Sequence, residues 1–136
     1  MFKIGDVAQR LALNPQTLYF YERIGLIPAP QRTEAGYRLF SQQDVDRLAF
    51  ITRAKSLGLS LDEIRSILAL KDGKSLTCQD VHDRLVSKLD QIETQIQQLQ
   101  RLHDELRPLI QECRSNFDPA HPDKVCIVLE NYPAPL

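Results

Sequence analysis

The chain lacks the features of a membrane protein or of a disulfide-bonded secreted fold. No run of about 18 apolar residues occurs in its 136 residues, and no apolar signal segment opens it. Its three cysteines are an odd number, which disfavours a framework of paired disulfides. We therefore expect a cytoplasmic protein with no membrane partner, whose thiols stay reduced and free to bind metal.

The chain also lacks the excess of positive charge that a non-specific nucleic-acid binder shows. It carries 17 Lys and Arg against 18 Asp and Glu, a net charge of −1. The charge is uneven, however. Residues 1–60 hold 8 basic against 5 acidic side chains, or +3, and the other 76 residues hold 9 against 13, or −4. An anionic partner is therefore expected to dock on the first half.

Two short helices joined by a tight turn are predicted at the start of the chain. Apolar residues recur there at helical spacing: Ile4, Val7, Ala8 and Leu11. Asn14 suits the N-cap and Pro15 the first position of a second helix, which Gly25 stops. The pattern fits a helix-turn-helix, whose second helix usually reads DNA, and equally an ordinary helical hairpin.

Residues 26–40 change character, because Pro28, Pro30 and Gly36 interrupt any helix. Arg32 and Arg38, on either side of a Glu-Ala-Gly turn, favour a small β-hairpin, or wing, whose groups suit phosphate contacts. A connecting loop with solvated arginines is the alternative.

Two further helices are predicted from their capping residues. Ser41 with Asp44 opens a helix that ends near Gly58, and Ser60 with Glu63 opens another that ends near residues 72–73. The first 73 residues can thus bury one modest core.

A long apolar seam follows, beginning after an N-cap at Thr77. Its residues are spaced three or four apart over about four heptads: Val81, Leu85, Leu89, Ile92, Ile96, Leu99, Leu102, Leu106 and Leu109 or Ile110. One helix cannot cover its own stripe, so a homodimer is expected. Cys78 and Cys113 are 35 residues apart, roughly 52 Å along a helix, so they cannot share a site within it. Antiparallel packing would bring Cys78 close to Cys113 of the partner subunit.

Several stretches resemble the MerR family of transcription regulators. They are Ile4-Gly-Asp-Val-Ala, Thr17-Leu-Tyr-Phe-Tyr-Glu-Arg-Ile-Gly-Leu-Ile, Arg32-Thr-Glu-Ala-Gly-Tyr-Arg-Leu-Phe, Asp44-Val-Asp-Arg-Leu-Ala-Phe-Ile and Leu57-Gly-Leu-Ser-Leu-Asp-Glu-Ile, and they cover about residues 2–70. The resemblance implies a mostly α fold. A winged helix-turn-helix DNA-binding domain would occupy residues 1–73, and an antiparallel coiled-coil dimerisation helix would occupy residues 77–112. Residues 113–136 would form a metal-binding loop, in which the stretch from Cys126 to Asn131 itself favours a short closing helix.

The resemblance also implies a function and a set of DNA contacts. The chain would be a regulator and not an enzyme. It would bind double-stranded promoter DNA and, on binding metal, distort it so that RNA polymerase can transcribe a metal-resistance gene. The implied contacts are Gln16, Thr17, Tyr19, Phe20 and Tyr21 on the recognition helix and Arg32, Tyr37 and Arg38 on the wing. At Tyr19 the family usually has Arg, so this chain lacks one phosphate-binding cation there.

The second half is similar to the family's zinc, cadmium and lead sensors. The match comprises Thr77-Cys-Gln-Asp and Ala120-His-Pro-Asp-Lys-Val-Cys, and it implies a ligand set of Cys78, Cys113, Cys126 and His121. Three thiolates favour a divalent soft ion, zinc first and otherwise cadmium, lead or mercury, whereas the family's copper(I) and gold sensors have Ser in place of Cys78. Cys113 is followed by Arg114 where those zinc sensors have a second cysteine, which argues against a two-zinc site.

The sequence also allows non-functional roles for two of the expected ligands and two other functions for the protein. Cys78 could be a small core residue, and His121 a solvated loop side chain. The cysteines could sense oxidants or electrophiles without metal. Three thiolates with an open position could also activate water in an enzyme, although no motif places an acid–base residue beside them.

Overall fold

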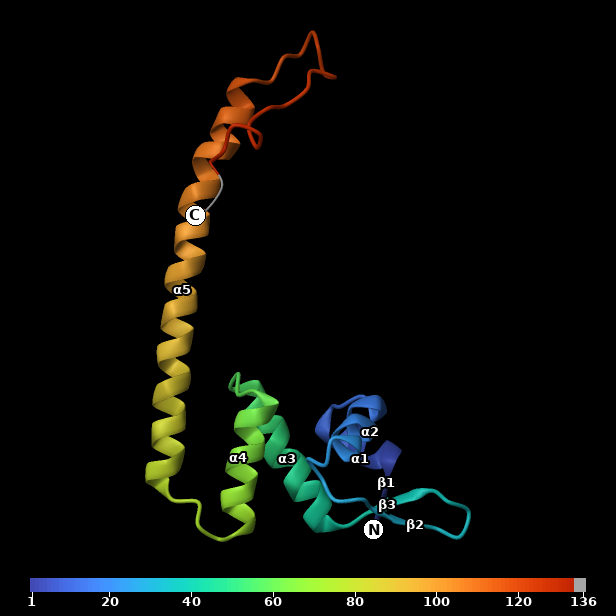
Figure 1. Cartoon of the computed structure of the whole chain (residues 1–136). Coiled ribbons are helices and arrows are strands. Elements are labelled where there is room, and N and C mark those ends of the chain that lie inside the picture. Colours follow the sequence, from blue (N-terminus) through green and yellow to red (C-terminus); the bar gives the residue numbers. More distant parts are fainter. Residues whose placement is uncertain (134–136) are drawn as a thin grey trace. The chain divides into compact units, whose positions relative to one another are not determined.

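The computed structural model describes residues 1–133 and divides the chain into two compact units, Met1–Leu85 and Val86–Leu136 (Figure 1). The last three residues of the expected segment 113–136 lie outside the described residues. Within the described part, no helix combines the length and apolar character needed to cross a membrane.

The first unit begins with the predicted helix-turn-helix. Helix α1 spans Ile4–Leu11 and α2 spans Pro15–Arg23. The Asn14 side chain accepts a hydrogen bond of 2.9 Å from the backbone N–H of Gln16, which caps α2 as expected. Gly25, at φ +75°, ends α2. Its N–H donates to the Glu22 carbonyl and that of Leu26 to the Tyr21 carbonyl, the Schellman pattern of a glycine-terminated helix.

The wing is a hairpin of β2 (Gln31–Arg32) and β3 (Arg38–Phe40), as the sequence predicted. The short strand β1 (Phe2–Lys3) pairs with the other side of β3, giving the antiparallel order β1-β3-β2. The prediction missed β1 because two residues carry no periodic signal.

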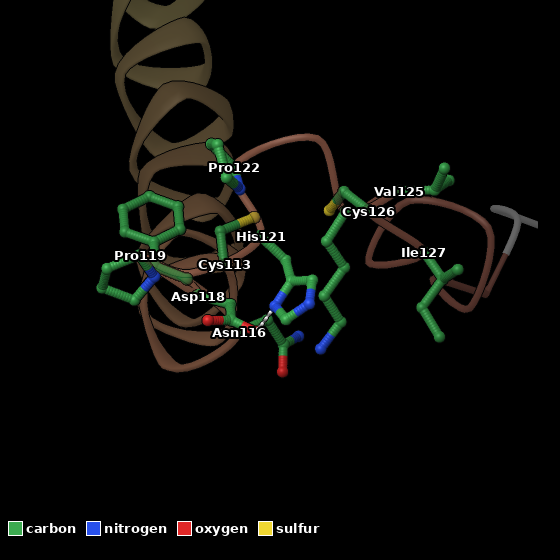
Figure 2. Close-up of a pocket in the computed structure, with 11 residues that line it drawn as sticks. Cys113, Asn116, Asp118, Pro119, His121, Pro122, Val125, Cys126 and Ile127 are labelled. Carbon is green, nitrogen blue, oxygen red and sulfur yellow. Dashed lines mark hydrogen bonds and ion pairs between the residues drawn. The ribbon is translucent and has the colours of Figure 1, made fainter.

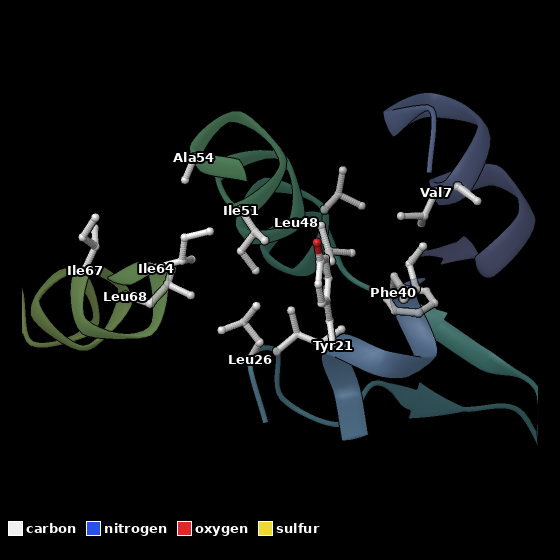
Figure 3. Close-up of a cluster of buried hydrophobic side chains, with 14 of the residues drawn as sticks. Val7, Tyr21, Leu26, Phe40, Leu48, Ile51, Ala54, Ile64, Ile67 and Leu68 are labelled. Carbon is white, nitrogen blue, oxygen red and sulfur yellow. The ribbon is translucent and has the colours of Figure 1, made fainter. Parts of the chain in front are cut away.

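Helices α3 (Gln42–Ser56) and α4 (Leu61–Asp72) complete this unit. The Ser41 hydroxyl accepts from the Asp44 N–H at 3.1 Å, and the Asp44 carboxylate accepts from the Ser41 N–H at 2.9 Å, so the predicted capping box forms. Apolar side chains from α1, α2, β3, α3 and α4 meet in one core (Figure 3): the largest fully buried ones are Phe40, Leu18, Leu26, Leu48, Ile51, Ile64, Leu68 and Val7. This core fixes α2 and the wing on one scaffold.

Arg47 of α3 links the elements around that core. Its Nε donates to the Leu26 carbonyl at 2.9 Å and its Nη1 to the Asp72 carboxylate at 2.7 Å. The hydrogen bond from Arg47 lowers the pKa of Asp72, so this link is present at neutral pH and weakens as acid protonates the carboxylate.

Helix α5 spans Cys78–Ser115 without a single buried residue. Thr77 and Asp80 cap its start, since the Thr77 hydroxyl accepts from the Asp80 N–H at 3.1 Å and the Asp80 carboxylate accepts from the Thr77 N–H at 3.0 Å. The predicted seam lies exposed along it, with Ile92 37% and Leu99 66% accessible. The helix therefore presents an uncovered apolar stripe to solvent.

The predicted closing helix from Cys126 is wrong. The described residues after it form turns, with one helical hydrogen bond from the Asn131 N–H to the Ile127 carbonyl. Pro133 lacks an N–H and disfavours helical geometry in the residue before it, which opposes helix at Tyr132. The segment instead returns along the end of α5 (Figure 1), where the Tyr132 hydroxyl donates to the Glu105 carboxylate at 2.9 Å and Val128 is buried.

Replacing Ser41 by Ala should lower the free energy of unfolding by about 1 kcal/mol, because it removes the capping hydroxyl and leaves a helical N–H without its acceptor. Urea denaturation followed by circular dichroism at one fixed protein concentration measures the effect. Gln43→Ala is the matched control, since Gln43 is exposed in the same turn. An equal loss in both variants would contradict the role of the cap.

Candidate nucleic-acid interface and metal site

Helix α2 exposes one row of polar and aromatic side chains and buries another. Gln16 is exposed, Thr17 and Tyr19 are half-buried, and Phe20 is 36% accessible, so these four can reach a surface partner. Tyr21 differs. It is 6% accessible and its ring packs in the core (Figure 3), and burial raises the pKa of its hydroxyl. The structure thus corrects the expectation that Tyr21 faces DNA: it is a packing residue, because it lies on the inner face of α2.

The wing holds its cations in defined positions. Arg32 is exposed and donates from Nη1 to the Gly36 carbonyl at 2.9 Å, across the turn. Tyr37 projects into solvent with 71% of its surface accessible. Arg38 is half-buried, and its Nε donates to the Glu22 carboxylate of α2 at 2.7 Å. All three wing residues expected to bind phosphate therefore lie at the surface or at its edge.

The structure adds two cations that the sequence reasoning missed. Lys3 lines a pocket of about 400 Å³ together with Tyr19, Tyr37 and Arg38. Arg23 is exposed on α2 with its guanidinium 5.5 Å from the Phe20 ring centroid. Lys3 had no sequence signal, because only the pairing of β1 with β3 brings it to the wing. Arg23 could have been found from its spacing, since it follows Phe20 by three residues on a helix.

A second pocket, in the unit Val86–Leu136, collects three of the four predicted metal ligands. Cys113, His121 and Cys126 line this cavity of about 740 Å³ with a largely apolar wall that includes Phe117 and Ile127. Figure 2 shows their side chains gathered where the loop after α5 returns to the helix. Soft thiolates and an imidazole are the donors that thiophilic divalent ions prefer, so the residue types suit such an ion, although their positions within the described part of one chain do not form a complete site.

The ionisable side chains of this pocket interact in two pairs, Cys113 with Cys126 and His121 with Asp118. Burial raises the pKa of the Cys113 thiol, and its interaction with the Cys126 thiol raises it further. The Nδ1 of His121 pairs with the Asp118 carboxylate at 3.0 Å, an arrangement that orients an imidazole and leaves Nε2 for a ligand bond. The described residues contain no group of three or more His, Cys, Asp or Glu side chains placed to hold a metal ion.

Cys78 is not among the residues that line this pocket. It is exposed at the first position of α5, in the unit Met1–Leu85. Its exposure removes the alternative that it is a buried core residue of the single chain.

A winged helix-turn-helix with a recognition helix, a cationic wing and a long trailing helix defines the class: a DNA-binding regulator. The sequence matches the family described as MerR HTH family regulatory protein over residues 2–71, and the one described as MerR, DNA binding over residues 45–109. The chain belongs to the MerR family of transcription regulators. Members of this family are DNA-binding regulators and not enzymes, which confirms that expectation.

Similar proteins include one that is named for mercuric resistance. The chain is 45% identical over 113 residues to an uncharacterised HTH-type transcriptional regulator of Synechocystis, covering 83% of this chain and 82% of that protein. It is 43% identical over 117 residues to the mercuric resistance operon regulatory protein of Bacillus cereus, covering 86% and 89%.

Two solved structures of metal complexes are also similar. A transcription regulator of Ralstonia metallidurans in complex with lead(II) is 34% identical with a TM-score of 0.72, covering 88% of this chain and 90% of that one. A MerR of Bacillus megaterium in complex with mercury(II) is 33% identical with a TM-score of 0.65, covering 95% and 97%.

Gly36→Ala should loosen the wing turn without a steric clash. Gly36 has φ +89° and open space where a Cβ would lie, so the penalty is backbone strain, about 1 kcal/mol. Hydrogen exchange of the Thr33 amide, which donates to the Tyr37 carbonyl, should speed up about fivefold. Gly36→Asn is the control, because Asn tolerates positive φ. If both variants lose protection equally, the turn does not depend on φ.

Proposed function

We propose that this chain is a homodimeric transcription activator that responds to a divalent thiophilic metal ion, zinc or one of cadmium, lead and mercury, at a metal-resistance promoter. The observation that carries the proposal is the shared pocket of Cys113, His121 and Cys126 at the end of a helix whose apolar seam is exposed. The relatives support the ion class, since one is named for mercuric resistance and two similar proteins were solved with lead(II) and mercury(II).

Dimerisation through α5 follows from the uncovered seam. Exposed leucines and isoleucines recur from Leu85 to Ile110, and water disfavours so long an apolar stripe. A second copy of α5 carries the same stripe and covers it most simply, with the two helices antiparallel.

Antiparallel pairing also supplies the ligand that one pocket lacks. Cys113 and Cys126 share a cavity, while Cys78 lies at the opposite end of the same helix. A helix of 38 residues is roughly 57 Å long, so Cys78 reaches such a pocket only on the other subunit. We assign one site to each dimer end, built from Cys113 and Cys126 of one chain and Cys78 of the partner subunit. His121, held by Asp118, is the fourth candidate.

We assign separate DNA contacts to α2 and to the wing. Phe20 and the half-buried Thr17 lie on the outer face of α2, and Arg32, Tyr37 and Arg38 lie on the wing. The wing residues grip phosphates, which positions the protein, and α2 enters the major groove. When bound, the ion neutralises thiolates from both chains and so favours the dimer geometry that distorts promoter DNA for RNA polymerase.

A thiol-based sensor of electrophiles is the alternative function, and Cys113 is a poor candidate for its reactive thiol. Reactive cysteines have lowered pKa values, because the thiolate is the nucleophile. Cys113 has the opposite shift, since burial and the neighbouring Cys126 raise its pKa. Promoter activation measured against a panel of divalent metals, peroxide and an alkylating agent separates the two functions. Activation by an electrophile and by none of the metals would overturn the metal proposal.

Introducing Asp at both Ile92 and Leu99 should convert the protein to a monomer even without metal, because each change buries a charge in the apolar interface. Sedimentation of the metal-free variant at micromolar concentration measures this. The matched control is Gln91→Asp with Gln98→Asp, which adds the same charge one residue before each seam position. A monomeric metal-free wild type would contradict the dimer and the shared site.

Mixing two variants tests whether the site spans both chains. In a heterodimer of Cys78→Ser and Cys113→Ser subunits, one end loses both ligands and the other keeps all three. Tight zinc binding should therefore return to about half of the wild-type capacity, whereas each homodimer lacks an intact site. The absorbance of thiolate-bound cobalt(II) gives an independent readout.

A site confined to one chain predicts a different result. Each subunit of the heterodimer would then lack one ligand, and no tight site would form. Such an outcome would refute the shared site while leaving DNA binding untouched, because the three cysteines lie outside the winged domain of residues 1–73.

A further inference from the structure

Three side chains from two elements meet between the recognition helix and the wing. Tyr19 and Glu22 are three residues apart on α2 and so share one helix face, and Arg38 reaches them from β3. The Arg38 Nε donates to a Glu22 carboxylate oxygen at 2.7 Å. Its Cζ lies 4.5 Å from the centroid of the Tyr19 ring, over its face. One guanidinium is thus held at its edge by a carboxylate and on its face by an aromatic ring.

These two contacts fix the guanidinium more fully than either would alone. The hydrogen bond to Glu22 limits rotation of the Arg38 side chain, and the face of the Tyr19 ring sets the tilt of the guanidinium plane. Both members of the ion pair are largely shielded, with 25% of the Arg38 side chain and 18% of the Glu22 side chain accessible. A flexible cation is thereby ordered before any ligand arrives, which lowers the entropy lost on binding.

The guanidinium of Arg38 still has N–H donors available for a ligand when Glu22 and Tyr19 position it. Arginine carries five N–H donors and the Glu22 contact uses the one on Nε, which leaves the terminal nitrogens with their planar fork. That fork matches the oxygens of a phosphate. The neighbouring pocket, which Lys3, Tyr19, Tyr37 and Arg38 line, provides a concave surface at this position.

We propose that Tyr19 serves DNA binding through the face of its ring, as a platform that, together with Glu22, positions Arg38 for a backbone phosphate. Tyr19 is a positioning residue, and its hydroxyl is dispensable. This inference rests on the proposed function, because it assumes that the wing meets DNA.

The chemistry of position 19 explains why a tyrosine suits this arrangement. A second arginine there would set one guanidinium against another and remove the ring that Arg38 covers, since like charges at this distance repel. Tyrosine instead provides an uncharged platform and leaves a single ordered cation between helix and wing.

The test compares Tyr19→Phe with Tyr19→Leu, each alone and combined with Arg38→Ala. Affinity and its salt dependence are measured for two probes, a duplex that the wild-type full-length protein selects from random sequences and an unselected duplex. Circular dichroism confirms folding, and the NMR shift of the Arg38 Nε–H reports whether the ring still lies over the guanidinium.

The platform predicts a definite pattern. Tyr19→Phe keeps the ring and binds like wild type, with the same salt slope. Tyr19→Leu loses the ring-current shift and weakens binding to both duplexes about two- to fivefold, the range for a partly exposed cation–π contact. Arg38→Ala lowers the salt slope by roughly one phosphate contact, and Tyr19→Leu adds no further loss in that background.

Other outcomes overturn the inference. Equal losses from Phe and Leu would assign the role to the hydroxyl, and a Leu effect that persists beside Arg38→Ala would mean that the ring contacts DNA itself. A Leu variant with wild-type affinity would leave the contact without a binding role. If the wild-type protein selects no duplex, the proposed function itself fails and this inference fails with it. That result differs from the outcomes above, in which the wild-type protein binds DNA and only the role of Tyr19 is wrong.

Discussion

Helix α5 has 38 residues and none of them is buried, so packing within the single chain cannot explain why this helix is stable. Isolated helices in water gain little from backbone hydrogen bonds, and most helical stability in proteins comes from packing an apolar face. In α5 that face runs from Val81 to Ile110 and stays accessible in the single chain. In the proposed function, covering this face with a second copy of α5 determines both the assembly of the protein and the place where its cysteines meet.

The two units of the chain differ in how their side chains are packed. The first unit has a closed core whose helix caps and Schellman turn are satisfied internally, so it holds α2 and the wing rigidly. The pocket of Cys113 and Cys126 has a mostly apolar wall and includes the paired side chains of His121 and Asp118. In the proposed function a rigid DNA-binding unit is joined to a metal site that one chain leaves incomplete, so the ligand can favour one arrangement without altering the DNA-binding unit.

Local signals in the sequence predicted most of the elements correctly. Asn14, Ser41, Ser60 and Thr77 cap helices as expected, since a cap depends only on residues a few positions away. The misses arose where distant segments decide the outcome. Strand β1 exists only through its pairing with β3, and Tyr21 lies inside because the core closes over that face of α2. The segment after Cys126 folds back on α5 instead of forming a helix, and the hydrogen bond from Tyr132 to Glu105 that holds it there joins residues far apart in the sequence.

Strand β3 also limits how this family member can change its wing. Side chains two apart in a strand share a face, so Phe40, anchored in the core, fixes the side on which Arg38 emerges. A residue gained or lost between them would rotate Arg38 to the opposite face and separate it from Glu22. The tip of the hairpin, at residues 34–35, is exposed and bears no such constraint. Insertions and deletions should therefore accumulate at the tip during evolution, while the length of β3 stays constant.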